Sequence, residues 1–384
     1  MLQRKDITKI WELKTDFTPR WLEPDFISSS LKSFSFSHLC SAVSQIKQKG
    51  YSFEWIMTVL LSLPFISGSS IHSMLSGCVK HHIEAGKDVF YRLKNHAGIN
   101  WRVVLWLFAG KFRDLVSQSS TNVTSPRCMI LDDTLISKSG KQIENVSRTW
   151  DHVFQRYVFG FKLLVLGYWD GVSFLPLDFS FHREKGKNKE KPYGLTRREY
   201  KQQYKKHRDK ESCSRERAEE VDRTKVSSGI KMFLRAVSMG FKVDYLLVDS
   251  WFTCDEIVKA VSGIKKRVVH LIGMYKTPKT KFTWRGGEYT YNQIRGIAGK
   301  AKRCRSLGLH YIGEEVLFRQ TPAMLFFSRN GKNGKWRVFL CTDTSLSFKR
   351  MIEIYQIRWT IEVFNKEAKQ LLGLGKCQSN DFDA

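Results

Sequence analysis

No hydrophobic run in this sequence of 384 residues is long enough to cross a lipid bilayer. The longest strongly apolar stretch, residues 56–66, is about half of the roughly 20 residues that a spanning helix needs, and Pro64 interrupts it. The first residues, MLQRKDITKIWELK, contain no apolar segment of the kind found in a secretory signal. The sequence therefore predicts a protein without a membrane partner.

Paired cysteines are also missing. The eight cysteines are scattered singly along the chain, and no CxxC pair occurs. This spacing is typical of reduced, buried thiols rather than of a disulfide framework. We therefore expect a cytoplasmic protein.

Acidic residues are scarce beside basic ones. The chain has 64 Lys and Arg against 37 Asp and Glu, which gives a net charge of +27. A protein this basic is expected to bind a polyanion, because neutralising phosphates releases their counterions. Nucleic acid is the first candidate, and an anionic membrane surface is the second.

Composition and periodicity divide the chain into four regions. Residues 1–125 are predicted to be mostly helical and to bind DNA, and a linker-like stretch, SQSSTNVTSP, follows at residues 117–126. Residues 126–276 read as buried strands and helices of a mixed sheet, with a basic segment at 182–211 that is either solvated or a phosphate-contacting arm. Residues 277–343 are rich in predicted strands, and residues 344–384 begin with a helix. The predicted class is therefore α/β, a mixed sheet with a late β-rich insertion and a helical N-terminal region.

Two predicted strands end in aspartate. Residues 128–133, CMILDD, end at Asp133, and residues 243–250, VDYLLVDS, reach Asp249 near their end. The carboxyl ends of neighbouring strands in an α/β sheet lie at one edge, where sites form. A single aspartate at such a position is more often a turn or helix cap, so each aspartate alone is weak evidence.

The segment YQIRWTIEVFNKEAKQ, residues 355–370, concentrates polar groups on one predicted helix face. At about 100° per residue, Tyr355, Arg358, Glu362 and Lys369 fall within a narrow stripe. Apolar side chains gather on the opposite side, as in a helix that packs on a core. From this helix alone, a solvated face with a surface ion pair remains the simpler interpretation.

If the last helix packs across the strand ends, the two aspartates and Glu362 would lie close enough together to form a site. Asp133, Asp249 and Glu362 would then supply hard oxygen donors, which suit Mg²⁺ or Mn²⁺. Two such ions are a known device for in-line attack on a phosphodiester. Arg358 and Lys369 would hold DNA phosphates beside the acids.

The spacing of Tyr355, Arg358, Glu362 and Lys369 resembles the YREK signature of bacterial insertion-sequence transposases, the DDE recombinases of the insertion-sequence-four family. LDDT and LLVDSWF resemble the two aspartate blocks of that family. The resemblance covers roughly residues 95–384. It implies an RNase H-like core with a β insertion between the second aspartate and the glutamate.

The resemblance also implies roles for single residues. The catalytic and metal-binding acids would be Asp133, directly before Thr134, then Asp249 and Glu362, with Asp132 as the neighbour that could replace Asp133. Tyr355, Arg358 and Lys369 would contact DNA. Trp336, in KWRVFLCTD, would stack on a flipped base during a DNA-hairpin step, although it could equally pack the β insertion.

As a member of this family, the protein would act in the bacterial nucleoid with two Mg²⁺ or Mn²⁺ ions. Its partners would be double-stranded DNA with transposon-end inverted repeats, target DNA and a second copy of the chain in a synaptic dimer. The chain stops fifteen residues after Lys369, whereas family members usually continue, so we interpret the C-terminus as truncated. Two rivals stay open at this point: a decayed copy that only binds DNA, and a stand-alone RNase H-like nuclease.

Overall fold

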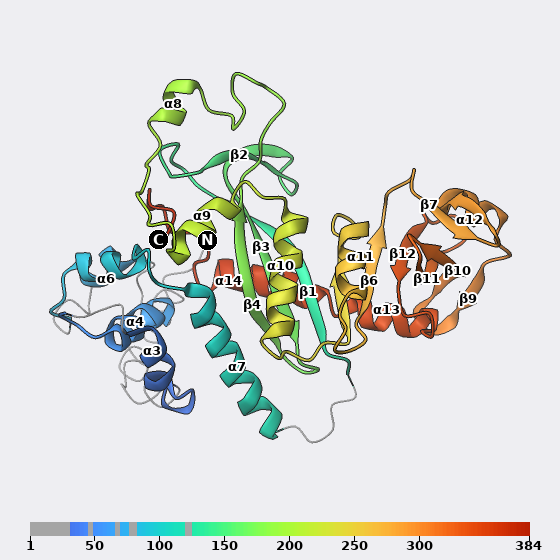
Figure 1. The fold of residues 1–384 in the computed structure, drawn as a ribbon, viewed down its shortest axis with the longest axis horizontal. Helices are drawn as coiled ribbons and strands as arrows, with labels where there is room; N and C mark the ends of the chain where they lie inside the picture. Colours follow the sequence, from blue (N-terminus) through green and yellow to red (C-terminus); the bar gives the residue numbers. More distant parts are fainter. Residues whose placement is uncertain (1–30, 45–48, 66–69, 77–82, 120–124) are drawn as a thin grey trace, which may run out of the picture.

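The structure of the chain is a computed structural model that describes residues 31–44, 49–65, 70–76, 83–119 and 125–384. The N-terminal stretch that lacks a secretory signal and the middle of the linker-like stretch lie outside these residues. Figure 1 shows a helical part, a central sheet and a second β-rich part along the longest axis. None of the described helices is both long and apolar enough to cross a membrane.

The central sheet is mixed. An antiparallel meander of β1, β3 and β4 is followed by β5 and β6, which run parallel to β1, so that the strands lie in the order β4-β3-β1-β5-β6. These five strands are Cys128–Ser137, Arg156–Trp169, Phe174–His182, Tyr245–Val248 and His270–Tyr275. The sequence-predicted α/β class with a large mixed sheet is therefore confirmed, and the strand order is consistent with an RNase H-like core.

The central strands are apolar on both faces because helices cover both sides of the sheet. On one face, Met129 and Leu131 join a core that also includes residues of α7, α10 and α11. On the other face, Cys128 and Ile130 pack into a core with residues of α13 and α14. These five helices are Trp101–Ser119, Lys225–Ser238, Asp255–Ser262, Phe348–Gln356 and Trp359–Gln370.

Two of these helices are N-capped by a hydroxyl side chain. The Thr224 hydroxyl accepts a hydrogen bond from the backbone N–H of Ser227 and begins α10, and Ser347 begins α13 in the same way. Gly229 of α10 lies against the side chain of Leu131, where a Cβ atom would collide. The absent side chain therefore lets α10 approach β1 closely.

Residues 277–343 continue the same sheet beyond β6. Strand β12 pairs antiparallel with β6, and β11, β10, β7 and β8 follow outward, so the β-rich part is an extension of the sheet (Figure 1). Its elements are β7 Lys281–Trp284, β8 Gly287–Thr290, α12 Tyr291–Ile297, β9 Lys302–Cys304, η3 Arg305–Leu307, β10 Leu309–Phe318, β11 Thr321–Asn330 and β12 Arg337–Cys341.

The described N-terminal helices pack around an apolar cluster of their own, centred on fully buried Ile56 and Phe90. They are α3 Phe36–Ser44, α4 Phe53–Ser62, η1 Leu63–Phe65, α5 Ile71–Ser76 and α6 Lys87–Lys94. Helix α7 leads from this cluster to the central sheet, where Ala109 packs against the core.

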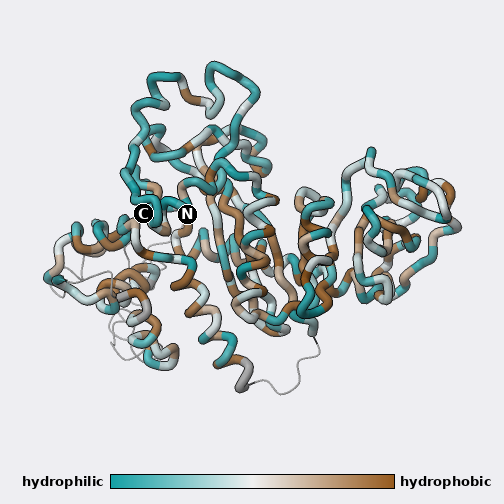
Figure 2. Tube along the Cα trace, in the orientation of Figure 1, coloured by the Kyte–Doolittle hydropathy of each residue, from teal (hydrophilic) through white to brown (hydrophobic). Residues whose placement is uncertain are grey.

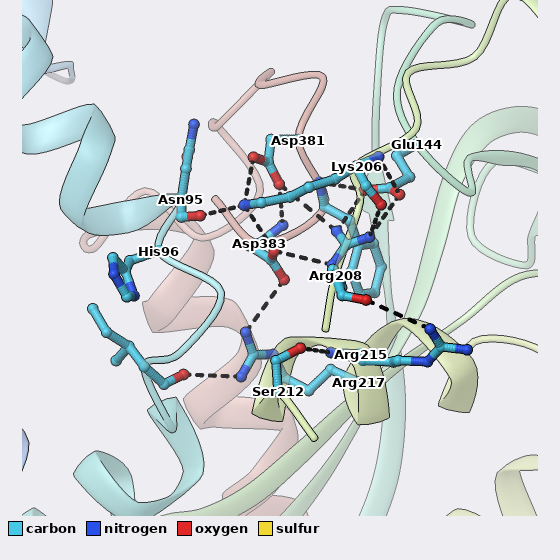
Figure 3. A network of polar contacts seen from close by, with 12 residues as sticks. Asn95, His96, Glu144, Lys206, Arg208, Ser212, Arg215, Arg217, Asp381 and Asp383 are labelled. Carbon is cyan, nitrogen blue, oxygen red and sulfur yellow. Dashed lines mark hydrogen bonds and ion pairs between the residues drawn. The ribbon is translucent and has the colours of Figure 1, made fainter. Parts of the chain in front are cut away.

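Beyond the carboxyl end of β1 the chain forms a polar lobe, which is largely hydrophilic in Figure 2. It contains β2 Ser147–Asp151, α8 Arg197–Lys201 and α9 Cys213–Glu220. The basic segment 182–211 runs through it. Part of that segment is bound rather than solvated, because Lys206 and Arg208 are half-buried or buried in a network of ion pairs (Figure 3).

This network holds the last residues of the chain against the lobe. The Arg208 guanidinium pairs with Glu144 at 2.6 Å and with Asp383 at 3.1 Å, and Lys206 pairs with Asp381 at 2.9 Å (Figure 3). Asp383 also meets Arg217 of α9 at 3.3 Å. The two basic residues of the segment are therefore used to fix the C-terminal residues.

We predict that Arg208→Met lowers the free energy of unfolding by about 3–5 kcal/mol, because it leaves the buried Glu144 carboxylate without its cation and removes one of the cations that pair with Asp383. Lys259→Met is the matched control, since Lys259 forms an exposed pair with Asp255. Its loss should cost less than about 0.5 kcal/mol. Urea denaturation of the three proteins measures both changes, and equal costs would contradict the structural role of Arg208.

His182 gives a second prediction, on pH. Its buried ring lies between the Arg223 carbonyl oxygen, which accepts from Nδ1, and the Ser180 hydroxyl, which faces Nε2. Burial lowers the pKa of His182 from its usual 6.5 to about 4. Between these two values the unfolded chain binds a proton that the folded chain does not, so stability falls as the pH drops through this window.

Between pH 6.5 and pH 4, the protonation of His182 in the unfolded chain should lower the free energy of unfolding by about 3 kcal/mol. The variant His182→Asn cannot take up this proton. Its free energy of unfolding, measured by denaturant titration at several pH values, should therefore decline less steeply than that of the parent protein. Parallel profiles would exclude a buried neutral imidazole.

Candidate active site

Two carboxylates lie side by side at the carboxyl edge of the central sheet. The parallel pairing of β1 with β5 ends at Leu131 opposite Val248. Asp132 and Asp249 are the next residues of their chains, so the two aspartates follow the last paired positions on neighbouring strands. The prediction placed Asp133 beside Asp249. In the structure Asp132 holds the position next to Asp249, and β1 continues past both of its aspartates to Ser137.

Strand alternation separates Asp132 from Asp133. Successive side chains of a strand point to opposite faces. Asp132 faces α14, where it meets Arg358 at 3.0 Å. Asp133 faces α10, where it pairs with Lys225 at 3.3 Å. The expectation that Asp133 would lie with Glu362 therefore has to be corrected: Asp132 occupies that face.

Arg358 joins the acids on the α14 face. One terminal nitrogen lies 3.0 Å from the Asp132 carboxylate and the other lies 2.5 Å from Glu362. The Arg358 side chain is only 12% exposed. Its Nε atom is buried and has no hydrogen-bond partner among the described residues. Arg358 thus bridges Asp132 and Glu362 by direct contact, and of these two Glu362 is one of the three predicted acids.

Burial raises the pKa of Asp132 to about 7. The Arg358 guanidinium opposes the effect of burial, whereas the neighbouring charges of Asp249 and Asp133 act in the same direction as burial, so a pKa of about 7 is the balance of these effects. The negative form of Asp132 therefore depends on a cation close to it. In this structure that cation is Arg358.

The segment carrying these groups consists of two helices instead of the single one predicted. Helix α13 ends at Gln356 and α14 begins at Trp359, and the backbone N–H groups of Ile357 and Arg358 bond three residues back, which tightens the turn. The prediction that these four polar side chains form one continuous stripe on a single helix is therefore wrong. The tightened turn allows Tyr355 to enter the core while Arg358 faces Asp132.

Tyr355 is buried, although it was predicted to contact DNA. Its hydroxyl donates to the carbonyl oxygen of Val248 at 3.2 Å, and its ring packs edge-on against Phe339. Burial raises the pKa of Tyr355 to about 12. The side chain therefore supports the strand end that carries Asp249, and it offers no group to a phosphate.

Lys369 lies further along α14 and faces the same strand. Its ammonium group donates to the Thr134 hydroxyl at 2.6 Å, and burial lowers its pKa. Because Thr134 and Asp132 point to the same face of β1, Lys369 and Arg358 form a cationic row along that face.

The oxygen donors of Asp132, Asp249 and Glu362 suit Mg²⁺ or Mn²⁺ in their chemistry. Among the described residues, however, no group of three His, Cys, Asp or Glu is arranged to hold a metal ion. Arg358 accounts for part of this, since its guanidinium lies between Asp132 and Glu362. Closer approach of the carboxylates to a metal ion requires Arg358 to turn away.

Trp336 lies at the start of β12, in the β-rich extension. Its ring is half-buried, packs against the sheet core, and lies 4.5 Å from the Arg329 guanidinium. Stacking on a base would require Arg329 to give way. The packing role of Trp336 is what the described contacts support.

Two exposed tryptophans beside the acids were missed by the sequence analysis. Trp251, two residues after Asp249, is 66% exposed, and Trp359, next to Arg358, is 60% exposed. Lys225 lies 5.0 Å from the Trp251 ring. The adjacency of each tryptophan to a site residue was visible in the sequence, but exposure is not encoded in a local pattern.

Comparison with known proteins gives two family matches. The family described as "DDE superfamily endonuclease" matches residues 67–276, and the family described as "Archaeal putative transposase ISC1217" matches residues 201–380. Together they span the strands and helices that carry all three acids of the α14 face. No curated protein matches the chain.

Among solved structures, the chain is similar to the NurA nuclease from Sulfolobus solfataricus. The identity is 10%, with 74% of this chain and 98% of the nuclease covered, at a TM-score of 0.26. A likeness at that TM-score carries no argument about this protein. The first family match covers more than half of the chain, and the chain therefore belongs to the DDE superfamily of endonucleases, enzymes that cleave nucleic acid.

Proposed function

We propose that this enzyme is a DNA transposase that cuts and joins DNA in a divalent-metal-dependent reaction. The observation that carries the proposal is the placement of Asp132, Asp249 and the Arg358–Glu362 pair at one edge of the mixed sheet. The match to a transposase family over residues 201–380 supports it. The strand order β4-β3-β1-β5-β6 is that of an RNase H-like core, the fold that the sequence resemblance implies.

We assign the metal-binding role to Asp132, Asp249 and Glu362. Asp133 is replaced by Asp132 because it faces α10. Divalent ions held there, two by analogy with other phosphodiester-cleaving sites, would activate a water or a 3′-OH and stabilise the leaving oxygen.

Arg358 and Lys369 would hold the DNA backbone at the site. A phosphate offers Arg358 an alternative bidentate partner, so DNA can draw the guanidinium away from Asp132 and Glu362. Lys369 already lies on the same face of β1 through its bond to Thr134. Binding of the substrate would then be coupled to release of the acids for metal binding.

The narrower features follow from the sequence resemblance. They are membership of the insertion-sequence-four family, action on transposon-end inverted repeats and target DNA, a synaptic homodimer, and cleavage through a DNA hairpin. The exposed rings of Trp251 and Trp359 offer aromatic faces beside the acids. They suit an unstacked base better than Trp336, which is covered by Arg329.

The assignment of the first acid can be tested by two matched substitutions. Asp132→Asn should reduce Mg²⁺-dependent DNA cleavage by more than about 100-fold, the upper limit usual for loss of a merely supporting contact. Asp133→Asn should retain activity within about tenfold, since its partner Lys225 lies on the other face. Initial cleavage rates and thermal midpoints of both variants are the measurements. The reverse order of rates would restore Asp133 as the catalytic acid.

Transposition itself can be tested on a plasmid that carries the coding region with its natural flanking DNA. With Mg²⁺, we expect breaks on both sides of the coding region and products in which the freed ends are joined to a second DNA. Chelation of the metal should abolish both. Sequencing and gel analysis of the products distinguish the outcomes.

Cleavage without joined products would identify a stand-alone nuclease instead. Binding of the flanking DNA without any cleavage would identify a decayed copy that retains only its DNA-binding surface.

A further inference from the structure

The hairpin that joins β2 to β3 displays two apolar side chains to solvent. Val153 is 83% exposed and Phe154 is 68% exposed, and both lie at the tip of this hairpin, in the turn between the two strands. Neither contributes to a core cluster of the described residues. Their exposure requires an explanation other than folding.

The tip is held in a defined conformation. The buried Asp151 carboxylate accepts hydrogen bonds from the backbone N–H groups of Val153 at 2.9 Å and Phe154 at 3.2 Å. Gln155 adopts a left-handed backbone with φ 50°, and its side-chain amide donates to the His152 carbonyl at 2.7 Å. The hairpin therefore presents its apolar side chains with little conformational freedom left to lose on binding.

Cations and aromatic rings surround these side chains. The Arg156 guanidinium lies 5.4 Å from the Phe154 ring, and that of Arg148 lies 4.5 Å from the Tyr157 ring. Tyr157 is 54% exposed and meets Trp150 edge-on. An apolar tip with an arginine on each side suits DNA, which offers base faces and phosphates together.

The chain beside β2 adds further positive charge. Backbone bonds from Arg148 to Tyr193 and from Trp150 to the Glu184 carboxylate fix the segment 183–193 next to the strand. Its lysines are exposed and form no ion pair in the described part of the chain: Lys185, Lys187, Lys189 and Lys191. The partner of this surface is therefore expected to be a polyanion.

The tip lies at the same end of the molecule as the candidate active site. In Figure 1, β2 and its hairpin stand above the central strands, beyond the carboxyl end of β1. Asp132 pairs with Val165 of β3, and β3 begins at Arg156. At about 3.3 Å per residue, Arg156 at the base of the tip is roughly 30 Å along β3 from the acids, which is about nine base pairs of DNA.

We propose that the β2–β3 hairpin is a DNA wedge. Val153 and Phe154 enter the duplex between base pairs about nine pairs from the cleaved phosphodiester, and Arg148 and Arg156 bind the flanking phosphates. The unstacked step bends the duplex, which brings the backbone onto the lysines of segment 183–193. This proposal rests on the proposed DNA-cleaving function and adds a second contact that distorts the substrate.

The test compares binding of a regular duplex with that of a duplex carrying a bulge, which is already unstacked at one step. Fluorescence anisotropy at about 50 mM and 200 mM salt separates ionic from apolar contacts. The double variant Val153→Ser/Phe154→Ser should weaken binding to the bulged duplex by about tenfold and leave the salt dependence unchanged. Arg148→Gln/Arg156→Gln should instead reduce the salt dependence.

Val172→Ser is the matched control. Val172 lies in the β3–β4 turn at the opposite end of the sheet, is 54% exposed, and is held by a similar bond to an aspartate, Asp170. The affinity of the Val172→Ser variant for both duplexes should equal that of the parent protein. Because all of these side chains are exposed, thermal midpoints should not change.

Equal affinity of the Val153→Ser/Phe154→Ser variant and the parent protein for both duplexes would overturn the wedge while leaving the cleavage function intact. Loss of self-association in sedimentation, with DNA affinity kept, would also overturn it and make the tip a protein contact. If the parent protein bound neither duplex at low salt, both the wedge and the proposed function would fail.

Discussion

The candidate active site depends on the bridge that Arg358 makes between Asp132 and Glu362. Without it, the partly buried carboxylate of Asp132 would face that of Glu362, from a distant part of the chain, and would lie near a third at Asp249. Like charges so placed repel each other. One guanidinium offsets this repulsion, and it does so at the position where a metal ion and a DNA phosphate would together take its place. The same contact therefore connects the last helix to β1 and neutralises part of the negative charge of the acids.

Most of the architecture around this bridge could be predicted from the sequence. The buried strands and the late β-rich stretch are local patterns, and the structure contains them. Two details differ from the prediction: β1 continues past Asp133 to Ser137, and the last segment forms two helices instead of one. Local sequence does not tell which of Asp132 and Asp133 faces α14. Strand β1 is buried on both faces, so its residues CMILDDTL carry no polar alternation that would tell which aspartate faces α14. Only the packing of α10 against Leu131 and of α14 against Thr134 decides it.

Tyr355 illustrates a second limit of sequence reasoning. A stripe of polar residues at helical spacing predicts one exposed face only if the helix is regular. Here the turn at Ile357 and Arg358 tightens, so Tyr355 rotates into the core and bonds to Val248 while Arg358 stays at the edge of the sheet. A residue type suited to DNA contact thus stabilises the strand that carries Asp249. Its place in the motif is then explained by positioning of the acid rather than by contact with a phosphate.

The large positive charge is divided between two physical tasks. Some of the basic residues are committed within the protein: Arg208 and Lys206 hold the last residues of the chain, and Arg102 pairs with buried Asp178 and Glu220. Arginines and lysines in such pairs cannot contribute to a polyanion surface without breaking buried contacts. Arg358 and Lys369 at the acids are likewise engaged, with Asp132, Glu362 and the Thr134 hydroxyl. The charge that can meet a polyanion without breaking such contacts is carried by exposed side chains, such as the lysines of segment 183–193 and Lys276, Lys279 and Lys281 at the start of the β-rich part.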